Sequence, residues 1–538
     1  MCDSVQNIAF SSEYSYYFNN TSENTFNPTS YRQFVLVEMS QLKQLLQHCP
    51  FCGKGPVHHR QSGRKITWSK EATSLTAHFR CSCGSKNGSS RKSWSTQSYI
   101  PGTKIRAGNI AVASSAHLSS ISFANLSSFF YAANIPGMSK KTFHNYSTGH
   151  IWPAIRKEYY KQQDELYNSL PQDITVSIDG QYDSPGYCAE YCVVSVMEAM
   201  SKRILCFCVI HKSEVGGVSQ RMELAGVKKC LEIIETKKTV EAITVDKHTS
   251  VCKFLRENGY SYYFDPWHAL KSFRKQVIKA LKGLPEAQRN ALLDLSRRFL
   301  RHLYYSLEFS GGDVQVFLEH IFSFFLHIQN IHEWSAGNFT HYLHLSNTTL
   351  LDKKFSNVFS CCHSYLDPNR PRIDSGSLEF QTILKIVQKK TFLDDIEHLK
   401  FGNFTSFLES FHNVCICCRP KRLFFSRSGM ECRTMIAALR YNETRRATEA
   451  GERVVVEQYE YYSKAKGGMR KKIKMGPVVL QWKRILVEKI FNQFANNENA
   501  IDEGNDSDSE RFEGEEEREI EFMDRRLDEL LIFDEDDV

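Results

Sequence analysis

The stretch at residues 174–186 constrains the fold most, because it joins a β-branched run to an acidic residue and a glycine. Ile174 to Ile178 is expected to form a central strand, and Asp179 follows it directly, ahead of Gly180. The carboxyl ends of strands are where open α/β sheets present their binding groups. An aspartate before a glycine is also ordinary turn chemistry. The elements around Asp179 therefore decide which interpretation applies.

The following hundred residues predict an α/β sheet built around that strand. Three consecutive strands are followed by a helix, a strand, a helix and a strand, which is the order of an RNase H-like sheet. The later strands are expected at 191–197, 203–210, 242–245 and 261–264, and the helices at 223–235 and 250–258. We therefore predict an α/β fold with an RNase H-like core.

Three carboxylates are candidates for one catalytic site. Asp179 follows the first predicted strand, Asp246 follows the fourth, and Glu409 lies in an aromatic segment expected to be helical. Carboxylate oxygens suit hard cations, and two Mg²⁺ ions about 3.5 to 4 Å apart clamp the attacking and leaving oxygens of phosphoryl transfer. Taken singly, each acid is as well explained as a cap or turn residue. Asp183, four residues after Asp179, is interpreted as a residue that shapes its turn.

Four of the 17 cysteines stand in a metal-binding pattern. Cys49 and Cys52 precede Gly53, and Cys81 and Cys83 follow about 30 residues later. Two paired-cysteine turns at this spacing predict a structural zinc ribbon with four thiolate ligands. The alternative is that one pair is incidental and a histidine replaces a ligand, namely His58, His59 or His78.

A second group, Cys361, Cys362 and His363, also suggests a metal site. It lacks a clear partner pair in the sequence, and we do not predict zinc there. The partners to consider are Cys415, Cys417 and Cys418.

The net charge of +7 divides unevenly along the chain. Residues 496–538 carry a net −15, so residues 1–495 carry +22. A basic body is typical of nucleic-acid binders, although dispersed charge is also ordinary solvated surface. Lys421, Arg422 and Arg427 are the candidates for contacts with DNA phosphates. The run Arg470–Lys474 fits phosphate contact, a nuclear import signal or a solvated face.

The sequence lacks the patterns of a membrane protein and of a secreted protein. No apolar run approaches the roughly 20 residues of a membrane span, and the N-terminus lacks a signal-peptide pattern. We expect a soluble intracellular protein with no membrane partner.

The predicted segments are a disordered arm (1–30), the zinc ribbon (31–104), a helical module able to bind DNA or to serve as a packing layer (105–170), the core (171–275 and 396–445), a mainly helical insertion (276–395), a basic C-terminal region (446–495) and a disordered acidic tail (496–538).

The chain resembles the eukaryotic cut-and-paste DNA transposases of the DDE superfamily, and most closely the Kolobok group. The resemblance covers most of residues 31–445 and is carried by Asp179–Gly186, Val245–His248, Phe264–Lys271, Leu408–His412, Pro420–Arg422, Met430, Arg433 and Asn442. It implies that Asp179, Asp246 and Glu409 hold two Mg²⁺ or Mn²⁺ ions per active site. It also implies that Asp265 and His268 brace that site.

The resemblance further implies an enzyme of DNA transposition and recombination in the nucleus. It would cleave and transfer strands of double-stranded DNA at transposon ends and target DNA, as a homo-oligomer that is at least a dimer. A THAP zinc module, which many Kolobok transposases carry, is missing from the pattern of cysteines and histidines. The alternative is a domesticated, catalytically silent DNA-binding or chromatin-associated protein that keeps the transposase fold.

Overall fold

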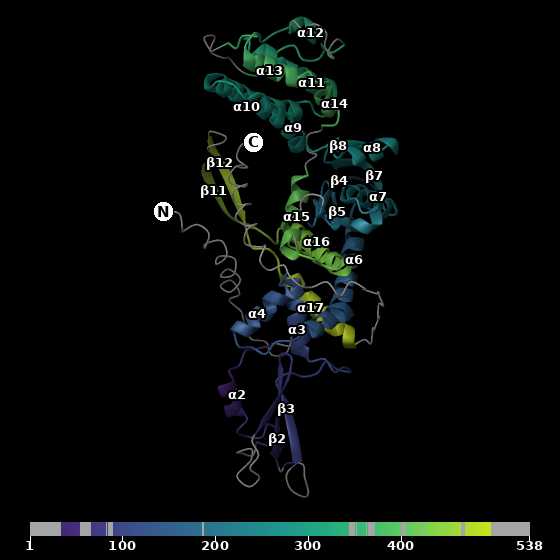
Figure 1. Ribbon diagram of the computed structural model, residues 1–538, viewed down its shortest axis with the longest axis vertical. Helices are drawn as coiled ribbons and strands as arrows, with labels where there is room; N and C mark the ends of the chain where they lie inside the picture. Colours follow the sequence, from purple (N-terminus) through teal and green to yellow (C-terminus); the bar gives the residue numbers. More distant parts are fainter. Residues whose placement is uncertain are drawn as a thin grey trace.

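The computed structural model describes residues 34–53, 66–81, 83, 90–184, 188–343, 350, 352–361, 363, 372–399, 405–421, 423–463 and 468–495. The predicted N-terminal arm and acidic tail lie outside these residues. Three regions follow one another along the long axis in Figure 1: a small β-sheet at one end, a larger sheet with its helices in the middle, and a group of helices at the other end.

A five-stranded mixed sheet forms the centre of the chain. Its spatial order is β6 (Ile204–His211), β5 (Tyr191–Glu198), β4 (Asp173–Tyr182), β7 (Thr239–Val245) and β8 (Tyr262–Phe264). The first three strands form an antiparallel meander, whereas β7 runs parallel to β4 and β8 runs parallel to β7. The predicted mixed α/β class is confirmed, with β4 as the central strand.

Helices cover both faces of this sheet. On one face, α7 (Met222–Glu235) packs against β5 and β6, with α8 (Thr249–Glu257) beside it. On the other lie α6 (Trp152–Ser169), α15 (Ser406–Cys418) and α16 (Arg427–Glu449). Alternate strand residues supply the two cores, so Val194 faces α7 while Met197 faces α16. A Cβ at Gly226 of α7 would lie 2.4 Å from Val194 Cγ2, so this close packing requires glycine.

The segment before the sheet forms further helices that share a core with α15 and α16. These are α3 (Ala107–Leu118), α4 (Phe123–Ala132), α5 (Lys140–Tyr146) and the π-helix η1 (Ser147–Ile151). The C-terminal helix α17 (Gln481–Ala495) packs against α3 and α6. The shared core includes Ile110, Phe143, Ile436 and Leu486. The helical segment therefore serves as a packing layer in this structure.

At the N-terminal end, α2 (Met39–Leu45) accompanies a three-stranded antiparallel sheet of β1 (Thr67–Glu71), β2 (Ser74–Cys81) and β3 (Ser90–Ser95). Phe34–Val37 has the residue types of a short strand, and the sequence predicts one there. That prediction is wrong, because these exposed residues pair with no strand among the described residues. An isolated extended run cannot satisfy its backbone hydrogen bonds in a sheet.

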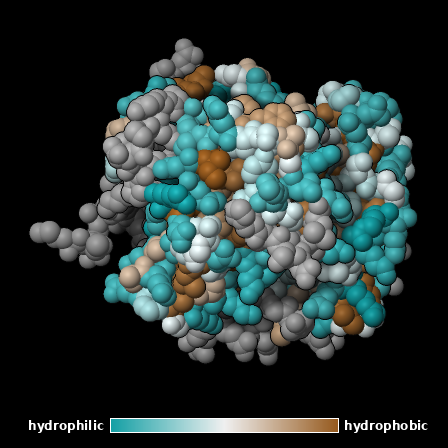
Figure 2. All heavy atoms as spheres, turned by 90° about the horizontal axis from the view of Figure 1, so that it is seen from above, coloured by the Kyte–Doolittle hydropathy of each residue, from teal (hydrophilic) through white to brown (hydrophobic). Residues whose placement is uncertain are grey.

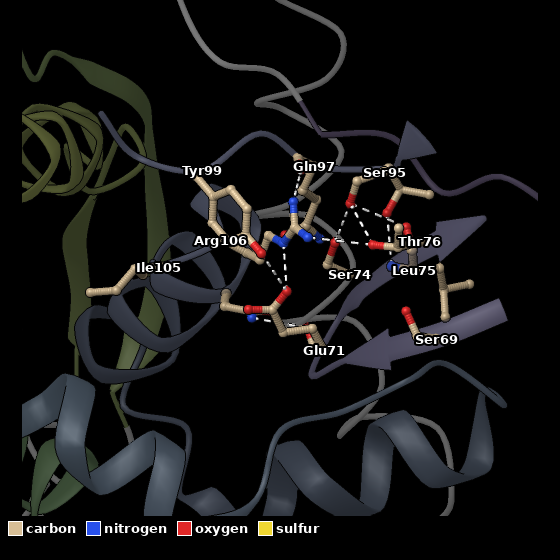
Figure 3. A network of polar contacts seen from close by, with 12 residues as sticks. Ser69, Glu71, Ser74, Leu75, Thr76, Ser95, Gln97, Tyr99, Ile105 and Arg106 are labelled. Carbon is tan, nitrogen blue, oxygen red and sulfur yellow. Dashed lines mark hydrogen bonds and ion pairs between the residues drawn. The ribbon is translucent and has the colours of Figure 1, made fainter. Parts of the chain in front are cut away.

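A polar network joins this small sheet to α3 (Figure 3). The buried Arg106 guanidinium lies 2.7 Å from Glu71 Oε2 and donates to the Gln97 carbonyl at 2.9 Å. It also stacks 3.6 Å above the Tyr99 ring. A planar guanidinium suits such combined stacking and ion pairing. The network fixes where the small sheet meets the helical layer.

The described residues at the opposite end of the chain are mainly helical, and the first of these helices begins directly after β8. Its elements are α9 (Pro266–Ala280), α10 (Glu286–Phe309), α11 (Val314–His327), α12 (Phe339–Tyr342), α13 (Leu378–Val387), α14 (Lys390–Ile396) and the two-residue strands β9 (Gly337–Asn338) and β10 (Lys354–Phe355). Phenylalanines dominate its core, including Phe299, Phe325 and Phe380. Seen from this end, Figure 2 shows mainly hydrophilic residues with small separate hydrophobic spots.

The remaining described elements are short or C-terminal. The 3₁₀ turns η3 (Lys212–Val215) and η4 (Ser219–Arg221) lead from β6 into α7. A hairpin of β11 (Val455–Ser463) and β12 (Gly468–Met475) projects from the end of α16 (Figure 1), and the basic run Arg470–Lys474 lies on β12. Among the residues described, no helix combines the length and apolar character needed to cross a bilayer.

Candidate active site and metal centre

Asp179 and Asp246 lie next to each other across two parallel strands. The pairing of β4 with β7 ends at Ile178 and Val245, and the two aspartates are the next residues along each chain. Strand β4 was expected to end at Ile178 but continues to Tyr182, because its pairing with β5 extends past Asp179. Asp179 therefore marks the end of the parallel pairing rather than the end of the strand.

Helix α15, which carries Glu409, packs against β4 and β5 beside Asp179. His412 of this helix is buried, and its Nδ1 lies 3.3 Å from Asp179 Oδ2. The Gln181 side chain, on the same face of β4 as Asp179, donates to the His412 carbonyl at 3.1 Å. Glu409 is exposed and stands three residues before His412, which puts both on one face of the helix. Asp179 and Asp246 thus adjoin the end of the β4–β7 pairing, and Glu409 lies on the helix whose His412 contacts Asp179.

Asp265 fixes the start of α15. It directly follows β8, is only 2% exposed, and its backbone N–H donates to the Val245 carbonyl at 3.4 Å. Its Oδ2 accepts hydrogen bonds from the Thr405 backbone N–H at 2.6 Å and from the Thr405 hydroxyl at 2.8 Å. Thr405 is the residue that precedes α15. Asp265 therefore ties the N-terminus of the helix that carries Glu409 to the sheet.

His268, the other predicted supporting residue, lies in the first turn of α9, and its side chain is outside the described residues. Among the predicted DNA contacts, Arg422 also falls outside them. Arg427 is held within the molecule, because its guanidinium contacts Glu214 at 2.9 Å and Glu431 at 3.2 Å. Lys421 is partly exposed in the turn that follows α15.

Glu223 is a fourth carboxylate near this edge, and it was not predicted. It lies in the first turn of α7 and accepts a hydrogen bond from the Tyr182 hydroxyl at 3.3 Å. A Cβ at Gly180 would lie 2.9 Å from Glu223 Cγ, so glycine after Asp179 leaves room for this side chain. Burial, followed by repulsion from Asp179 and Asp246, raises the pKa of Glu223 to about 7. Negative charge is therefore concentrated at the sheet edge.

Sequence reasoning assigned no role to His412 or Glu223, although each carried a signal. His412 stands three residues after Glu409, a spacing that brings two side chains to one face of a helix. Glu223 is the first acidic residue of the helix that follows the meander. Asp183 accepts from the backbone N–H groups of Glu190 at 3.2 Å and Tyr191 at 3.1 Å, consistent with its expected role in shaping the turn.

The four predicted zinc ligands converge at the other end of the chain. The Sγ atoms of Cys49 and Cys83 lie 3.7 Å apart, and those of Cys52 and Cys81 lie 3.6 Å apart. All four sulfurs lie within 4.8 Å of one another. Sulfurs bound at about 2.3 Å around a tetrahedral Zn²⁺ are separated by about 3.8 Å. The donor set therefore fits a structural zinc ion.

Local backbone geometry prepares this site. Gly53 closes the first turn with φ +69° and donates to the Cys49 carbonyl at 2.8 Å. The Cys83 backbone N–H lies 3.5 Å from Cys81 Sγ, and this contact lowers the pKa of Cys81 to about 7. The neighbouring Cys81 sulfur in turn raises the pKa of Cys83 to about 12. Four thiols held this close cannot all ionise until a cation compensates their charge.

The first prediction concerns loss of one ligand from the four-cysteine cluster. Cys52→Ser is expected to unfold α2 and the three-stranded sheet, because their small core rests on Leu42, Ala77 and Phe79 beside the cysteines. Zinc contributes about 10 to 16 kcal/mol of apparent folding free energy in small sites of this kind. Limited proteolysis should then cut this region while the five-stranded sheet stays resistant.

The control for this experiment is Cys188→Ser, which alters an exposed cysteine outside the cluster and should leave the digestion pattern unchanged. Equal protease resistance of Cys52→Ser and wild type would show that the four cysteines do not hold the ribbon through a metal.

The second prediction concerns the pKa of Glu223. A raised pKa means that the folded chain holds this proton more tightly than the unfolded chain does. The resulting stability is present below about pH 4.5 and is lost as the pH rises through about 7. Glu223→Gln carries no charge and should be more stable than wild type at pH 8, by roughly 1 to 3 kcal/mol, with a smaller difference at pH 5.

Urea unfolding of both proteins at pH 5 and pH 8, without added Mg²⁺, measures this difference. Glu232→Gln, which alters an exposed carboxylate of the same helix, is the matched control and should show no such trend. A stability difference that does not change with pH would contradict the assignment.

One known protein family matches part of the chain. The family model for Mutator-like transposases matches residues 31–230, which include the four-cysteine cluster, Asp179 and Glu223. No curated protein matches the chain. The match gives no support to a place within the Kolobok group, and it points to a transposase-related function. Over residues 31–230 the chain thus carries the pattern of the Mutator-like transposase family.

Proposed function

We propose that this protein is a DNA transposase that cleaves and transfers strands at transposon ends by a two-metal DDE mechanism. The observation that carries the proposal is that Asp179 and Asp246 adjoin the end of the β4–β7 pairing, where α15, the helix that carries Glu409, contacts Asp179 through His412. The order and direction of the five strands support an RNase H-like core. The match to Mutator-like transposases supports the reaction class.

The donor set fits divalent cations. Asp179, Asp246 and Glu409 would hold Mg²⁺ or Mn²⁺, since hard cations prefer carboxylate oxygens. Two such ions supply activation of the attacking oxygen and stabilisation of the leaving 3′ oxygen in phosphoryl transfer. The mutual repulsion that contributes to the raised pKa of Glu223 is of the kind that bound cations relieve.

Residues around the acids keep them in place. His412 contacts Asp179 from α15, so it orients the carboxylate of a central strand and couples the helix to it. Asp265 holds Thr405 and therefore the first turn of the helix that carries Glu409. Catalytic groups must be held close to their productive geometry by such supports.

The DNA partner is inferred from charge and from the family. Residues 1–495 carry +22, and β12 carries the basic run Arg470–Lys474 on a projecting hairpin. Two-stranded ribbons of this type are one of the ways in which proteins enter DNA grooves. We extend the proposal to a nuclear protein that pairs two transposon ends as a dimer or larger oligomer.

The third prediction tests the three acids. Asp179→Ala, Asp246→Ala and Glu409→Ala should each lower strand cleavage more than about 100-fold, because loss of an outer-shell partner alone costs about 10- to 100-fold. The assay uses DNA from the termini that flank the gene, with Mg²⁺ or Mn²⁺, and measures nicking and joining products. Glu232→Ala on the surface of α7 is the control and should cleave like wild type.

Two results of this assay would reject the enzyme. Equal activity in all variants would assign any cleavage to a contaminant or to another site. DNA binding without cleavage by wild type would favour the catalytically silent DNA-binding alternative.

The fourth prediction separates positioning from catalysis at Asp265. Asp265→Ala should raise the Mg²⁺ concentration needed for half-maximal cleavage by roughly 10-fold or more, because the first turn of α15 loses its anchor. Thr405→Ser keeps both hydrogen bonds and should behave like wild type. An unchanged Mg²⁺ dependence in Asp265→Ala, in protein with a normal circular dichroism spectrum, would show that Asp265 does not position the site.

A further inference from the structure

A second cluster of metal-binding side chains lies in the helical insertion, far from the acids and from the ribbon. It consists of His327, His332, Cys361 and His363, and one donor atom from each lies within 4.8 Å of all the others. The sequence predicts no zinc at Cys361 and His363 and offers Cys415, Cys417 and Cys418 only as partners to consider. Instead, His327 at the end of α11 and His332 in the following segment meet them, while Cys415 and Cys418 are buried in the core that includes α16.

The distances in the cluster match those of a metal site. His363 Nε2 lies 3.2 Å from the Nδ1 atoms of both His327 and His332, and Cys361 Sγ lies 3.5 Å from His327 Nδ1. Nitrogen ligands at about 2.0 to 2.1 Å from a tetrahedral Zn²⁺ are separated by about 3.3 Å, and a nitrogen and a sulfur ligand by about 3.6 Å. The observed separations therefore fit around one ion.

The orientation of the rings favours a central ion over hydrogen bonding among the histidines. The three imidazole planes cross at 71° to 88°, with ring centroids 4.9 to 5.1 Å apart, so three ring edges converge. A neutral imidazole carries one N–H, so His363 Nε2 can donate to only one of the two facing nitrogens. A cation accepts a lone pair from every donor at once. Three imidazoles and one thiolate form a set that zinc prefers.

The backbone brings the donors together through pairings of its own. His327 is the last residue of α11, and residues 332–334 run antiparallel to residues 359–361. In this pairing the Cys361 backbone N–H donates to the His332 carbonyl at 3.0 Å, and that of Trp334 donates to the Phe359 carbonyl at 2.9 Å. His332 and Cys361 are therefore neighbours before any ion arrives.

A buried carboxylate on α11 holds the other side of the same segment. Glu319 is fully buried and accepts from the backbone N–H groups of Asn357 and Val358, both at 2.7 Å, and from the Ser356 hydroxyl at 2.8 Å. Burial opposes its ionisation, but these hydrogen bonds and the one from Gln315 lower the pKa of Glu319 overall. The segment that carries Cys361 is thus docked on α11 two turns before His327.

We propose that His327, His332, Cys361 and His363 bind a structural zinc ion through Nδ1, Nδ1, Sγ and Nε2 respectively. All four coordination positions come from side chains, which is typical of structural rather than catalytic zinc. The ion clamps residues 359–361 and His363 to the C-terminal end of α11. This site is independent of the proposed transposase activity, and its metal can be measured without any DNA substrate.

The fifth prediction is the metal content of the full-length protein. Untagged wild type, purified without chelators and dialysed against zinc-free buffer, should hold two zinc ions per chain by mass spectrometry of the metal. His363→Ala and Cys361→Ser should each hold one, Cys52→Ser should hold one, and the double variant His363→Ala/Cys52→Ser should hold none. His341→Ala alters an exposed histidine of the same insertion and should keep both.

A further variant distinguishes loss of a zinc ligand from unfolding of the region around it. His363→Cys replaces one zinc ligand by another and should keep two ions, and its cobalt derivative should show a stronger thiolate-to-cobalt absorption band than that of wild type. A wild-type content of no zinc, or of one zinc that Cys52→Ser loses, would overturn the proposal. It would also be overturned if His363→Ala and Cys361→Ser both kept two ions.

Discussion

The parallel pairing of β4 with β7 is the constraint on which the candidate site depends. The two strands are separated by more than fifty residues, yet their register ends at Ile178 and Val245 and leaves Asp179 and Asp246 side by side. A slip of one residue would turn every side chain of β4 to the other face of the sheet. Cores on both faces oppose such a slip, because Val176 and Ile178 are buried toward α7 while Gln181 and Asp179 contact α15. Hydrophobic burial thus sets the positions of the acids.

The third acid depends on a contact across a much longer stretch of chain. Glu409 follows the helical insertion, and a loop of that length costs only a little more to close than a shorter one. After the insertion, the chain is held against the sheet by Asp265, which follows β8 and accepts two hydrogen bonds from Thr405. The backbone of residues 398–399 extends the sheet beside β8 just before this contact, with the Phe264 N–H donating to the His398 carbonyl at 2.7 Å. The insertion can therefore vary in its own packing without moving Glu409.

The sequence predicted the local patterns well and the long-range partners poorly. The alternation of strands and helices from residue 174 to 264 follows from the periodicity of apolar residues. The spacing of Cys49, Cys52, Cys81 and Cys83 is enough to indicate a metal-binding cluster. The strand expected at Phe34–Val37 had the right residue types, but strand formation needs a partner that no local pattern supplies. Glu223 and His412 lie near Asp179 because α7 and α15 pack on opposite faces of β4, and no local pattern predicts that packing. The roles of Lys421, Arg422 and Arg427 remain predictions, because charge alone does not say whether an arginine contacts phosphate or, as Arg427 does, a neighbouring carboxylate.

The two cysteine- and histidine-containing clusters stand where regular secondary structure is sparse. Among the described residues, the N-terminal sheet has a separate core of six buried residues, and residues 352–361 and 363 contain a two-residue strand and otherwise irregular backbone. A core of six residues buries little apolar surface to offset conformational entropy. Phe355 and Val358 of the second segment, in contrast, belong to the large core that includes the insertion. A bound ion would add to this packing by linking ligands from separate turns at a single point. In the insertion, Glu319 and the pairing of residues 332–334 with 359–361 already hold three of the four ligands near their final positions, so ion binding there has to order little more than His363.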